Sequence, residues 1–196
     1  DGTNTTITVN GSIGSRATSG NLERYSIYHH TGTGSITAIN NNGTMGVYEN
    51  GASSTGTVIW NKSTIGHINN AASGTMTSSG RNTIANGAGG VITKIDNDGT
   101  IESDNKWTIK NITGHIGEID NSGTIEAGAN GTNISAQNAE AAIRNYGGTI
   151  TTITNSGLIS ANEQTIQNTG GAVIGTINNT ASGTIRAKGN HQQAIR

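Results

Sequence analysis

The chain has 196 residues, of which 30 are Gly and only 31% are hydrophobic, with no Cys, no Pro, no Phe and a formal net charge of −1. The missing cysteines exclude a disulfide-stapled fold, and the near-zero charge argues against a general nucleic-acid binder. No stretch approaches the roughly 20 apolar residues of a membrane helix. Disorder is not indicated either, because disordered chains of low hydrophobicity usually carry a high net charge.

Residues 1–33 are expected to form a degenerate first coil of a repeating structure. Val9, Ile13 and Ile27 stand in places comparable to those of later apolar residues, and His29 replaces an Asn. The chain opens on Asp1 without an initiator Met or an apolar signal segment, which is typical of a piece cut from a longer, processed polypeptide.

From residue 34 onward one pattern recurs six times: Ile-x-x-Ile-x-Asn, then Gly-x-Ile or a close variant, then Ile-x-Asn. The copies start near residues 34, 63, 90, 114, 148 and 171, and their first isoleucines lie 29, 27, 24, 34 and 24 residues apart. Periods in this range indicate a solenoid, and short β-branched runs closed by Asn or Gly predict strands. We therefore expect an all-β fold, a right-handed three-sided parallel β-helix of about seven coils, with residues 34–196 as one continuous solenoid domain.

Alignment of the copies gives columns of one residue type. The paired isoleucines of the first strand are three residues apart, which predicts a bend or bulge between them. Stacked Asn side chains are expected to hydrogen-bond along the rod, and Gly is expected to open a tight corner. The columns are Asn41, Asn70, Asn97, Asn121, Asn155 and Asn179; Asn61, Asn86, Asn111, Asn145 and Asn168; and Gly43, Gly74, Gly99, Gly123, Gly157 and Gly183.

Three copies carry insertions between their second and third strands, at residues 14–24, 46–57 and 127–141. They should leave from one corner, and loops on a rigid scaffold are where binding usually takes place. Aromatic residues that follow the third-strand isoleucine should point outward, either to contact a partner or to stack on each other, whereas Trp107 is expected to pack inside a corner. The candidate binding residues are Tyr28, Trp60, Tyr48, Glu49, Arg16 and Arg24.

Seven of the twelve acidic residues fall between residues 96 and 126. The register places Asp96 beneath Asp120 and Glu102 beneath Glu126, about 5 Å apart, and such like-charge pairs destabilise a sheet. Either Lys94, which stacks on Glu118, or a bound cation should compensate. These four acids are therefore weak candidate metal ligands, although no metal motif is present.

The same segment, with Lys94, Lys106 and Lys110, is the one candidate for a polysaccharide-processing site. We find no motif of a known catalytic class, and the prediction is that the chain is not an enzyme, has no catalytic residue and needs no cofactor.

The phrases Ile-Asp-Asn-Asp-Gly-Thr-Ile (95–101), Ile-Asp-Asn-Ser-Gly-Thr-Ile (119–125) and Ile-Thr-Asn-Ser-Gly-Leu-Ile (153–159) resemble repeats in passenger domains of Gram-negative type V autotransporters. The resemblance extends over nearly the whole chain from Gly34. It implies a passenger segment on the bacterial cell surface, outside the outer membrane, attached to the membrane only through a C-terminal β-barrel that this sequence does not contain.

The function that the resemblance implies is adhesion or self-association through polyvalent polar contacts. The expected partners are like molecules on neighbouring cells, or a protein or glycan of a host surface, and not nucleic acid. A structural stalk that carries another functional domain is the alternative, and a polysaccharide-processing β-helix is a further one.

Overall fold

The computed structural model describes residues 5–17, 25–32, 34–49, 56–128, 141–189 and 193–196. Every regular element in these ranges is a strand, twenty in all, and none is a helix that could cross a membrane. The first coil consists of β1 (Thr5–Val9), β2 (Ser12–Ala17) and β3 (Tyr25–His29). The remaining strands are β4 (Ile36–Asn41), β5 (Thr44–Glu49), β6 (Thr57–Asn61), β7 (Thr64–Asn70), β8 (Thr75–Ser78), β9 (Asn82–Asn86), β10 (Val91–Asn97), β11 (Thr100–Ser103), β12 (Trp107–Ile112), β13 (His115–Asn121), β14 (Thr124–Ala127), β15 (Ala141–Tyr146), β16 (Thr149–Asn155), β17 (Leu158–Ala161), β18 (Gln164–Thr169), β19 (Val173–Asn179) and β20 (Thr184–Ala187).

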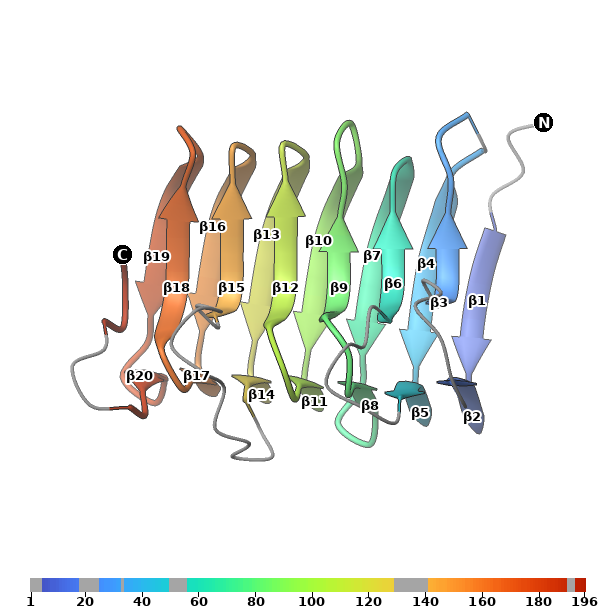
Figure 1. Ribbon diagram of the computed structural model, residues 1–196, viewed down its shortest axis with the longest axis horizontal. Helices are drawn as coiled ribbons and strands as arrows, with labels where there is room; N and C mark the ends of the chain where they lie inside the picture. The colour runs from blue at the N-terminus through green and yellow to red at the C-terminus, as the bar shows by residue number, and fades with distance from the viewer. Residues whose placement is uncertain (1–4, 18–24, 33, 50–55, 129–140, 190–192) are drawn as a thin grey trace.

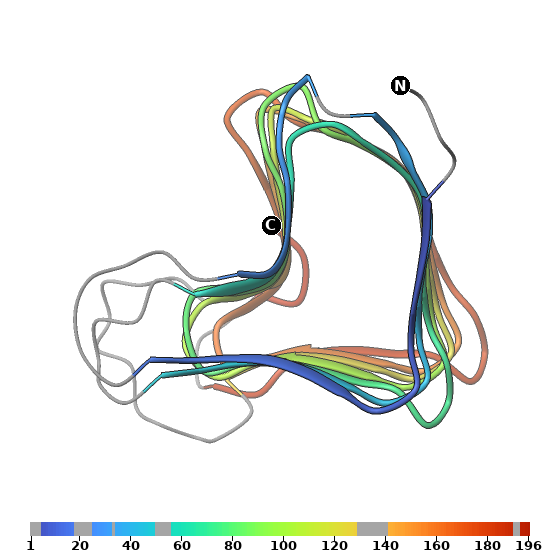
Figure 2. The ribbon, with the colours of Figure 1, turned by 90° about the vertical axis from the view of Figure 1, so that its right-hand side faces the viewer.

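Every third strand pairs with its counterpart in the next coil, and all pairs are parallel. Sheet A contains β1, β4, β7, β10, β13, β16 and β19; sheet B contains β2, β5, β8, β11, β14, β17 and β20; and sheet C contains β3, β6, β9, β12, β15 and β18. The coils stack into a rod (Figure 1), and the view down its axis shows three walls in which successive coils nearly superpose (Figure 2). The prediction of a three-sided parallel β-helix of about seven coils is confirmed.

The core of the rod is made of the stacked isoleucines. Ile65, Ile92 and Ile116 pair in register along sheet A, and all three are fully buried. Between Ile92 and Ile95 two consecutive residues, exposed Thr93 and half-buried Lys94, lie toward the outside. Strict alternation is therefore broken and the strand bends, as the spacing of three residues predicts.

Two ladders of asparagines run along the rod, buried except at the C-terminal end, where Asn168 is half-buried and Asn179 is exposed. In the first, each Nδ2 donates to the Oδ1 of the next coil over 2.7–2.8 Å, from Asn41 to Asn179. In the second, the same bond recurs at 2.9 Å from Asn61 to Asn168. Among the described residues, Thr113 is the one non-glycine residue with a positive φ. The Asn columns therefore arise from side-chain stacking, and left-handed backbone at the turns plays no part.

The Gly column that precedes the second strand has a different cause from the expected one. A Cβ atom built on Gly123 would lie 2.1 Å from the carbonyl oxygen of Gly99 in the coil below, and the φ of Gly123 is not positive. Close approach of stacked backbones, and not the conformational freedom of a corner, requires glycine here.

The first coil follows the register of the others. Ile7 pairs with Ile39, Ile13 with Met45 and Ile27 with Ile59. Buried His29 stands opposite Asn61, and its Nδ1 lies 3.0 Å from Asn61 Oδ1, so a ring nitrogen occupies the first rung of the second ladder. The expectation that Val9 stands in the place of a later apolar residue is wrong, because Val9 pairs with Asn41 and occupies the Asn column of sheet A, while Ile7 holds the isoleucine position.

Candidate functional site: the outer face of sheet C

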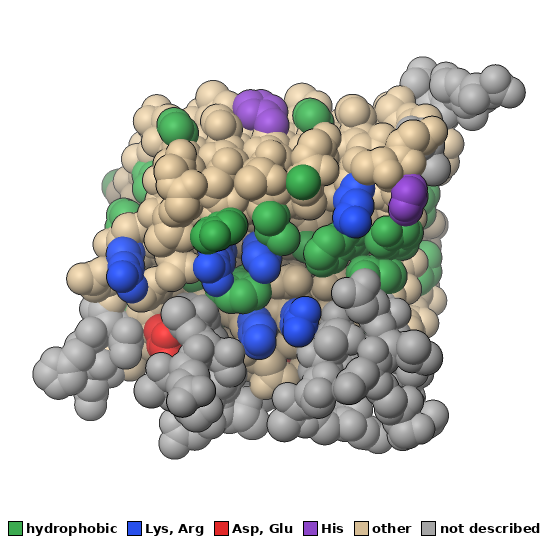
Figure 3. All heavy atoms as spheres, turned by 45° about the horizontal axis from the view of Figure 1, so that its top comes forward, with side chains coloured by type: hydrophobic (Ala, Val, Ile, Leu, Met, Phe, Trp, Pro, Cys, Tyr) green, Lys and Arg blue, Asp and Glu red, His purple; other side chains and the backbone are tan. Residues whose placement is uncertain are grey.

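The residues after the third-strand isoleucines form one column on sheet C, in which Tyr28 is exposed, Trp60, Lys110 and Arg144 are half-buried, and Ala85 and Gln167 are buried. The column formed by these residues is in register through five strand pairs, as predicted, and reads Tyr28, Trp60, Ala85, Lys110, Arg144 and Gln167. Figure 3 shows this side of the rod, where hydrophobic, Lys and Arg side chains gather along the middle. Aromatic residues dominate the N-terminal half of the column and cations its middle.

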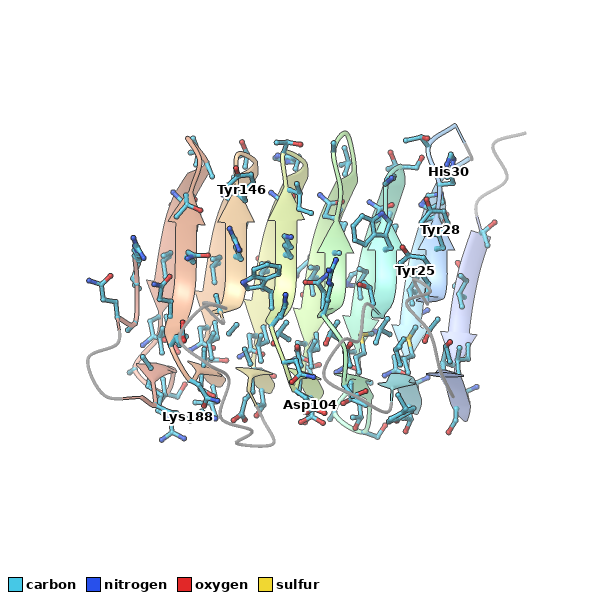
Figure 4. All side chains as sticks on the ribbon, viewed as in Figure 1. Tyr25, Tyr28, His30, Asp104, Tyr146 and Lys188 are labelled. Carbon is cyan, nitrogen blue, oxygen red and sulfur yellow. The ribbon has the colours of Figure 1, made fainter. Side chains whose placement is uncertain are left out.

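The aromatic part is built around Tyr25, which the sequence analysis did not single out. The Tyr25 ring lies 4.7 Å from that of Tyr28 and 6.0 Å from that of Trp60, and the ring of Tyr28 lies 5.7 Å from that of His30. Tyr25 and Tyr28 on β3, and His30 directly after it, follow one another on the same side of the rod (Figure 4). Tyr28 is 43% exposed. Tyr25 thus links the two predicted aromatic residues, which stack through it, and leaves Tyr28 open to a partner.

Trp107 is not a corner packing residue, and the expectation that it points inward is wrong. Thr108 and Ile109 are both fully buried, so the alternation of the strand is interrupted between them and Trp107 faces the same way as Lys110. The Nζ atom of Lys110 lies 4.1 Å from the centroid of the Trp107 ring. The indole is therefore part of the outer surface and not of the core.

Two further cations lie near this indole, one just before β12 and one on β15. The Cζ atom of Arg144 lies 4.4 Å from the Trp107 centroid, and the Nζ atom of Lys106 lies 5.7 Å from it. Arg81 precedes β9, and its carbonyl accepts the Trp107 backbone N–H. It belongs to the same group because its charge lowers the pKa of both Lys106 and Lys110. We refer to Trp107, Arg81, Lys106, Lys110 and Arg144 as the Trp107 cluster.

The Trp107 cluster is a concentration of like charge. Burial, and after it the charges of Arg144, Arg81 and Lys106, together lower the pKa of Lys110 to about 8. Burial and the charge of Arg81 also lower the pKa of Lys106. Within the described part of the chain none of the four cations forms an ion pair. The contacts with the indole, each worth about 0.5–2 kcal/mol, are the attraction that offsets this repulsion.

The acidic residues of the segment 96–126 lie on other faces. On sheet A, Asp96 pairs in register with Asp120 and Lys94 with Glu118, as predicted. Lys94 Nζ lies 2.8 Å from Asp96, 3.7 Å from Glu118 and 3.9 Å from Asp120, and His67 Nε2 lies 2.6 Å from Asp96. The hydrogen bond to Asp96 raises the pKa of Lys94, as do the charges of the other two carboxylates. The sequence analysis expected either Lys94 or a bound cation to compensate the like charges, and in the structure Lys94 contacts these carboxylates.

The second pair of like charges lies on sheet B. Glu102 pairs with Glu126, as the register predicts. Lys188 forms an ion pair with Glu126, and Thr77 donates a hydrogen bond to Glu102. Burial raises the pKa of Glu102, and the charges of Asp104 and Glu126 add to the effect. Within the described ranges, no group of three or more His, Asp or Glu side chains is arranged to hold a metal ion.

The residues of the candidate polysaccharide-processing site are therefore not brought together in one place. Asp96 and Lys94 belong to sheet A and Glu102 to sheet B, whereas Lys106 and Lys110 belong to the outer face of sheet C. In Figure 4, Asp104 and Lys188 lie at the lower edge of the rod, away from Tyr25 and Tyr28 on β3. The acids and the two lysines do not face one another.

The remaining candidate binding residues come from the insertions. Tyr48, on β5 of sheet B, is 44% exposed, and its ring lies over Gly46 of its own strand. Tyr48 and Tyr28 therefore lie on two different sheets and are not brought together. The backbones of Arg16 and Glu49 belong to β2 and β5, while their side chains and the whole of Arg24 lie outside the described residues.

The three insertions all connect sheet B to sheet C, as the prediction of a shared corner requires. They join β2 to β3, β5 to β6 and β14 to β15, and residues 18–24, 50–55 and 129–140 within them lie outside the described part of the chain.

No protein-family model, curated protein or solved structure matches this chain. What the outer face of sheet C can do must therefore follow from its own side chains.

Proposed function

We propose that this chain is an attachment segment of a bacterial surface passenger, a stiff rod that binds a neighbouring cell or a host surface through the outer face of sheet C. The observation that carries the proposal is the contrast between the inside and the outside of the rod. The isoleucine and asparagine columns repeat from coil to coil, whereas the outward column of sheet C changes from aromatic to cationic to neutral.

Folding of the rod does not call for such a column. Coil stacking is supplied by the isoleucine core and the asparagine ladders, which need nothing from the outward residues. The column contains exposed Tyr28 and half-buried Trp60 and Arg144, and Tyr, Trp and Arg are the residue types enriched at binding interfaces. A rigid rod that presents several weak contacts at once also gains avidity. The resemblance of 95–101, 119–125 and 153–159 to passenger repeats supports a location outside the outer membrane.

The proposal can be tested with protein-coated beads and a pair of matched variants. Beads that carry the purified chain are scored for clumping with each other and for attachment to epithelial cells, against uncoated beads. Tyr28→Ala and Tyr48→Ala remove the same ring, at 43% and 44% exposure, from sheet C and sheet B. We expect Tyr28→Ala to reduce attachment or clumping, and Tyr48→Ala to leave both close to wild type.

The outcomes separate the alternatives. Clumping alone assigns self-association with a like molecule, and cell attachment alone assigns a host partner. Equal loss in both variants would contradict the assignment to sheet C and would favour the corner formed by the insertions. Folded wild-type chain that neither clumps nor attaches would refute the proposal and leave a stalk as the function.

A further inference from the structure

The Trp107 cluster differs from every other charged group in the described part of the chain. On sheet A one cation, Lys94, contacts three carboxylates within 3.9 Å, and on sheet B Lys188 pairs with Glu126. Around Trp107, four cations from three consecutive coils are held near one another, and none has a carboxylate partner among the described residues. Among the described residues, Lys94 and Lys188 therefore pair with carboxylates, whereas the four cations of the Trp107 cluster have no such partner.

Such an arrangement costs stability in the isolated rod. Like charges at adjacent positions of neighbouring strands destabilise a sheet, and Lys110 and Arg144 are direct register partners. The guanidinium group of Arg144 makes no hydrogen bond with the described residues, and its Nε atom is buried without a partner. An anion that approached from outside would relieve the repulsion and supply the missing charge.

We propose that the Trp107 cluster binds an acidic polysaccharide that carries carboxylates as uronic acid units. The inference rests on the proposed function, because it assigns a ligand class to the same outer face of sheet C. Arg144 would meet a carboxylate with its planar fork, and Lys110 and Lys106 would meet the next ones as point charges. The edge of Trp107 and the aromatic group of Tyr25, Tyr28 and Trp60 would contact the sugar rings.

The dimensions and the charge of the rod favour this class over others. The cluster spans three neighbouring strands, or about 10 Å at the usual strand spacing, which suits a thin chain with one charge on each sugar or on every second one. Duplex DNA carries one charge per about 1.7 Å, and this rod has a net charge of −1, with Asp96, Glu118 and Asp120 on sheet A and Glu102 and Glu126 on sheet B. A densely charged, wide polyanion would be repelled by those faces.

The test compares two double variants that remove the same charges from different faces. Lys110→Gln with Arg144→Gln alters the cluster, and Arg186→Gln with Lys188→Gln alters exposed positions at β20 of sheet B. Binding of polygalacturonate, neutral dextran and single-stranded DNA is measured at two salt concentrations, after circular dichroism has shown that each variant is folded. A Trp60→Phe background, in which Trp107 is the one remaining Trp, reports contact through its fluorescence.

We expect the wild-type chain to bind polygalacturonate, more weakly at higher salt, and to ignore dextran. The Lys110/Arg144 variant should lose about tenfold or more in affinity, the loss typical of charged hydrogen bonds, and the Arg186/Lys188 variant less than about twofold. The emission of Trp107 should change on binding in the Trp60→Phe background and not when Lys110 and Arg144 are also replaced.

Three results would overturn the inference: no binding of polygalacturonate by the folded chain, equal loss in the two double variants, or tighter binding of DNA than of polygalacturonate. The experiments also distinguish failure of this ligand assignment from failure of the proposed attachment function. Beads that attach to cells without binding polygalacturonate would refute the ligand class alone. Polygalacturonate binding that depends on Lys110 and Arg144, with no attachment or clumping of beads, would refute the attachment function alone.

Discussion

Replacement of Asn97 by Ala removes one rung from the middle of the first asparagine ladder. Asn97 is fully buried and accepts from Asn70 Nδ2 over 2.7 Å. Its own Nδ2 donates to Asn121 Oδ1 over 2.7 Å and to the Thr124 carbonyl over 3.0 Å. Alanine keeps none of these bonds. Asn70 Nδ2 retains the carbonyls of Gly74 and Thr100, whereas the buried Asn121 Oδ1 loses the donor that Asn97 supplies.

The magnitude follows from those contacts. Each net hydrogen bond contributes about 0.5–1.5 kcal/mol, and a buried group left without a partner costs about 1–3 kcal/mol. We expect Asn97→Ala to lower the free energy of unfolding by about 3–5 kcal/mol. Asn42→Ala is the matched control, because Asn42 is exposed and donates to Asn10 Oδ1 on the surface. Its cost should stay within about 0.5 kcal/mol.

A third variant separates the direction of the hydrogen bonds from the space that the side chain fills. Asn97→Asp keeps the shape but turns the donor into an acceptor that faces Asn121 Oδ1 and the Thr124 carbonyl. The loss should exceed that of alanine at pH 7. It should shrink as the pH falls through the raised pKa of the buried carboxyl, because the protonated form is neutral and can donate one bond.

Urea unfolding followed by circular dichroism measures all three variants. The reasoning is refuted if Asn97→Ala unfolds at the same urea concentration as Asn42→Ala with an unchanged slope. That result would mean that the ladder bonds add no net stability, and that the columns of Asn reflect packing alone. A variant of Asn97→Asp that is no more stable at pH 4 than at pH 7, relative to wild type, would contradict the donor assignment.

Other predictions use the same unfolding measurement. The unfolded chain binds more protons than the folded one between about pH 8 and the ordinary pKa of 10.5, because the pKa of Lys110 is lowered; stability therefore rises with pH across this window. Lys110→Met should remove about 1 kcal/mol of that rise, a value reduced for the partial exposure of the ammonium group, and equal rises in both proteins would count against it. Ile95→Ala, at a fully buried site, should cost about 2–5 kcal/mol, whereas Val173→Ala, at 55% exposure, should cost about 0.5 kcal/mol or less; equal costs would argue against the assigned core. Gly123→Ala places a methyl group 2.1 Å from a backbone oxygen and should cost about 2 kcal/mol or more, whereas Gly11→Ala meets no atom within 4 Å and should be neutral or slightly stabilising; similar values would show that the coils can move apart.

The spacing of isoleucines and asparagines predicted the fold because a solenoid repeats its interior. Every coil must present the same residue types to the coils above and below, so the columns can be aligned without knowledge of the structure. The register of Asp96 on Asp120 and of Lys94 on Glu118 followed from the same alignment and is confirmed. The register of Glu102 on Glu126 is likewise confirmed. The grouping of these acids with Lys106 and Lys110 did not follow, because an alignment shows which residues stack and not which residues of different sheets face one another.

The outer face of sheet C shows where such an alignment fails. Lys110 and Arg144 were placed in one column from the sequence alone, although 34 residues separate them. Trp107 was expected inside because it stands two positions before Ile109. Residues two positions apart face the same side only in a strand without a bend. Thr108 and Ile109 both turn inward, which reverses the indole and creates a cation cluster where the pattern indicates a packed corner.

The sequence by itself therefore determined the β-helix, the contents of its core and the stacking of its columns, since these depend on a periodicity that is local and repeated. Only the tertiary structure decided which side chains meet across columns. Tyr25 links Tyr28 to Trp60, and Arg144 reaches the ring of Trp107. Such contacts depend on where each strand bends and on which sheet carries each column. Neither property follows from the repeat pattern of the sequence.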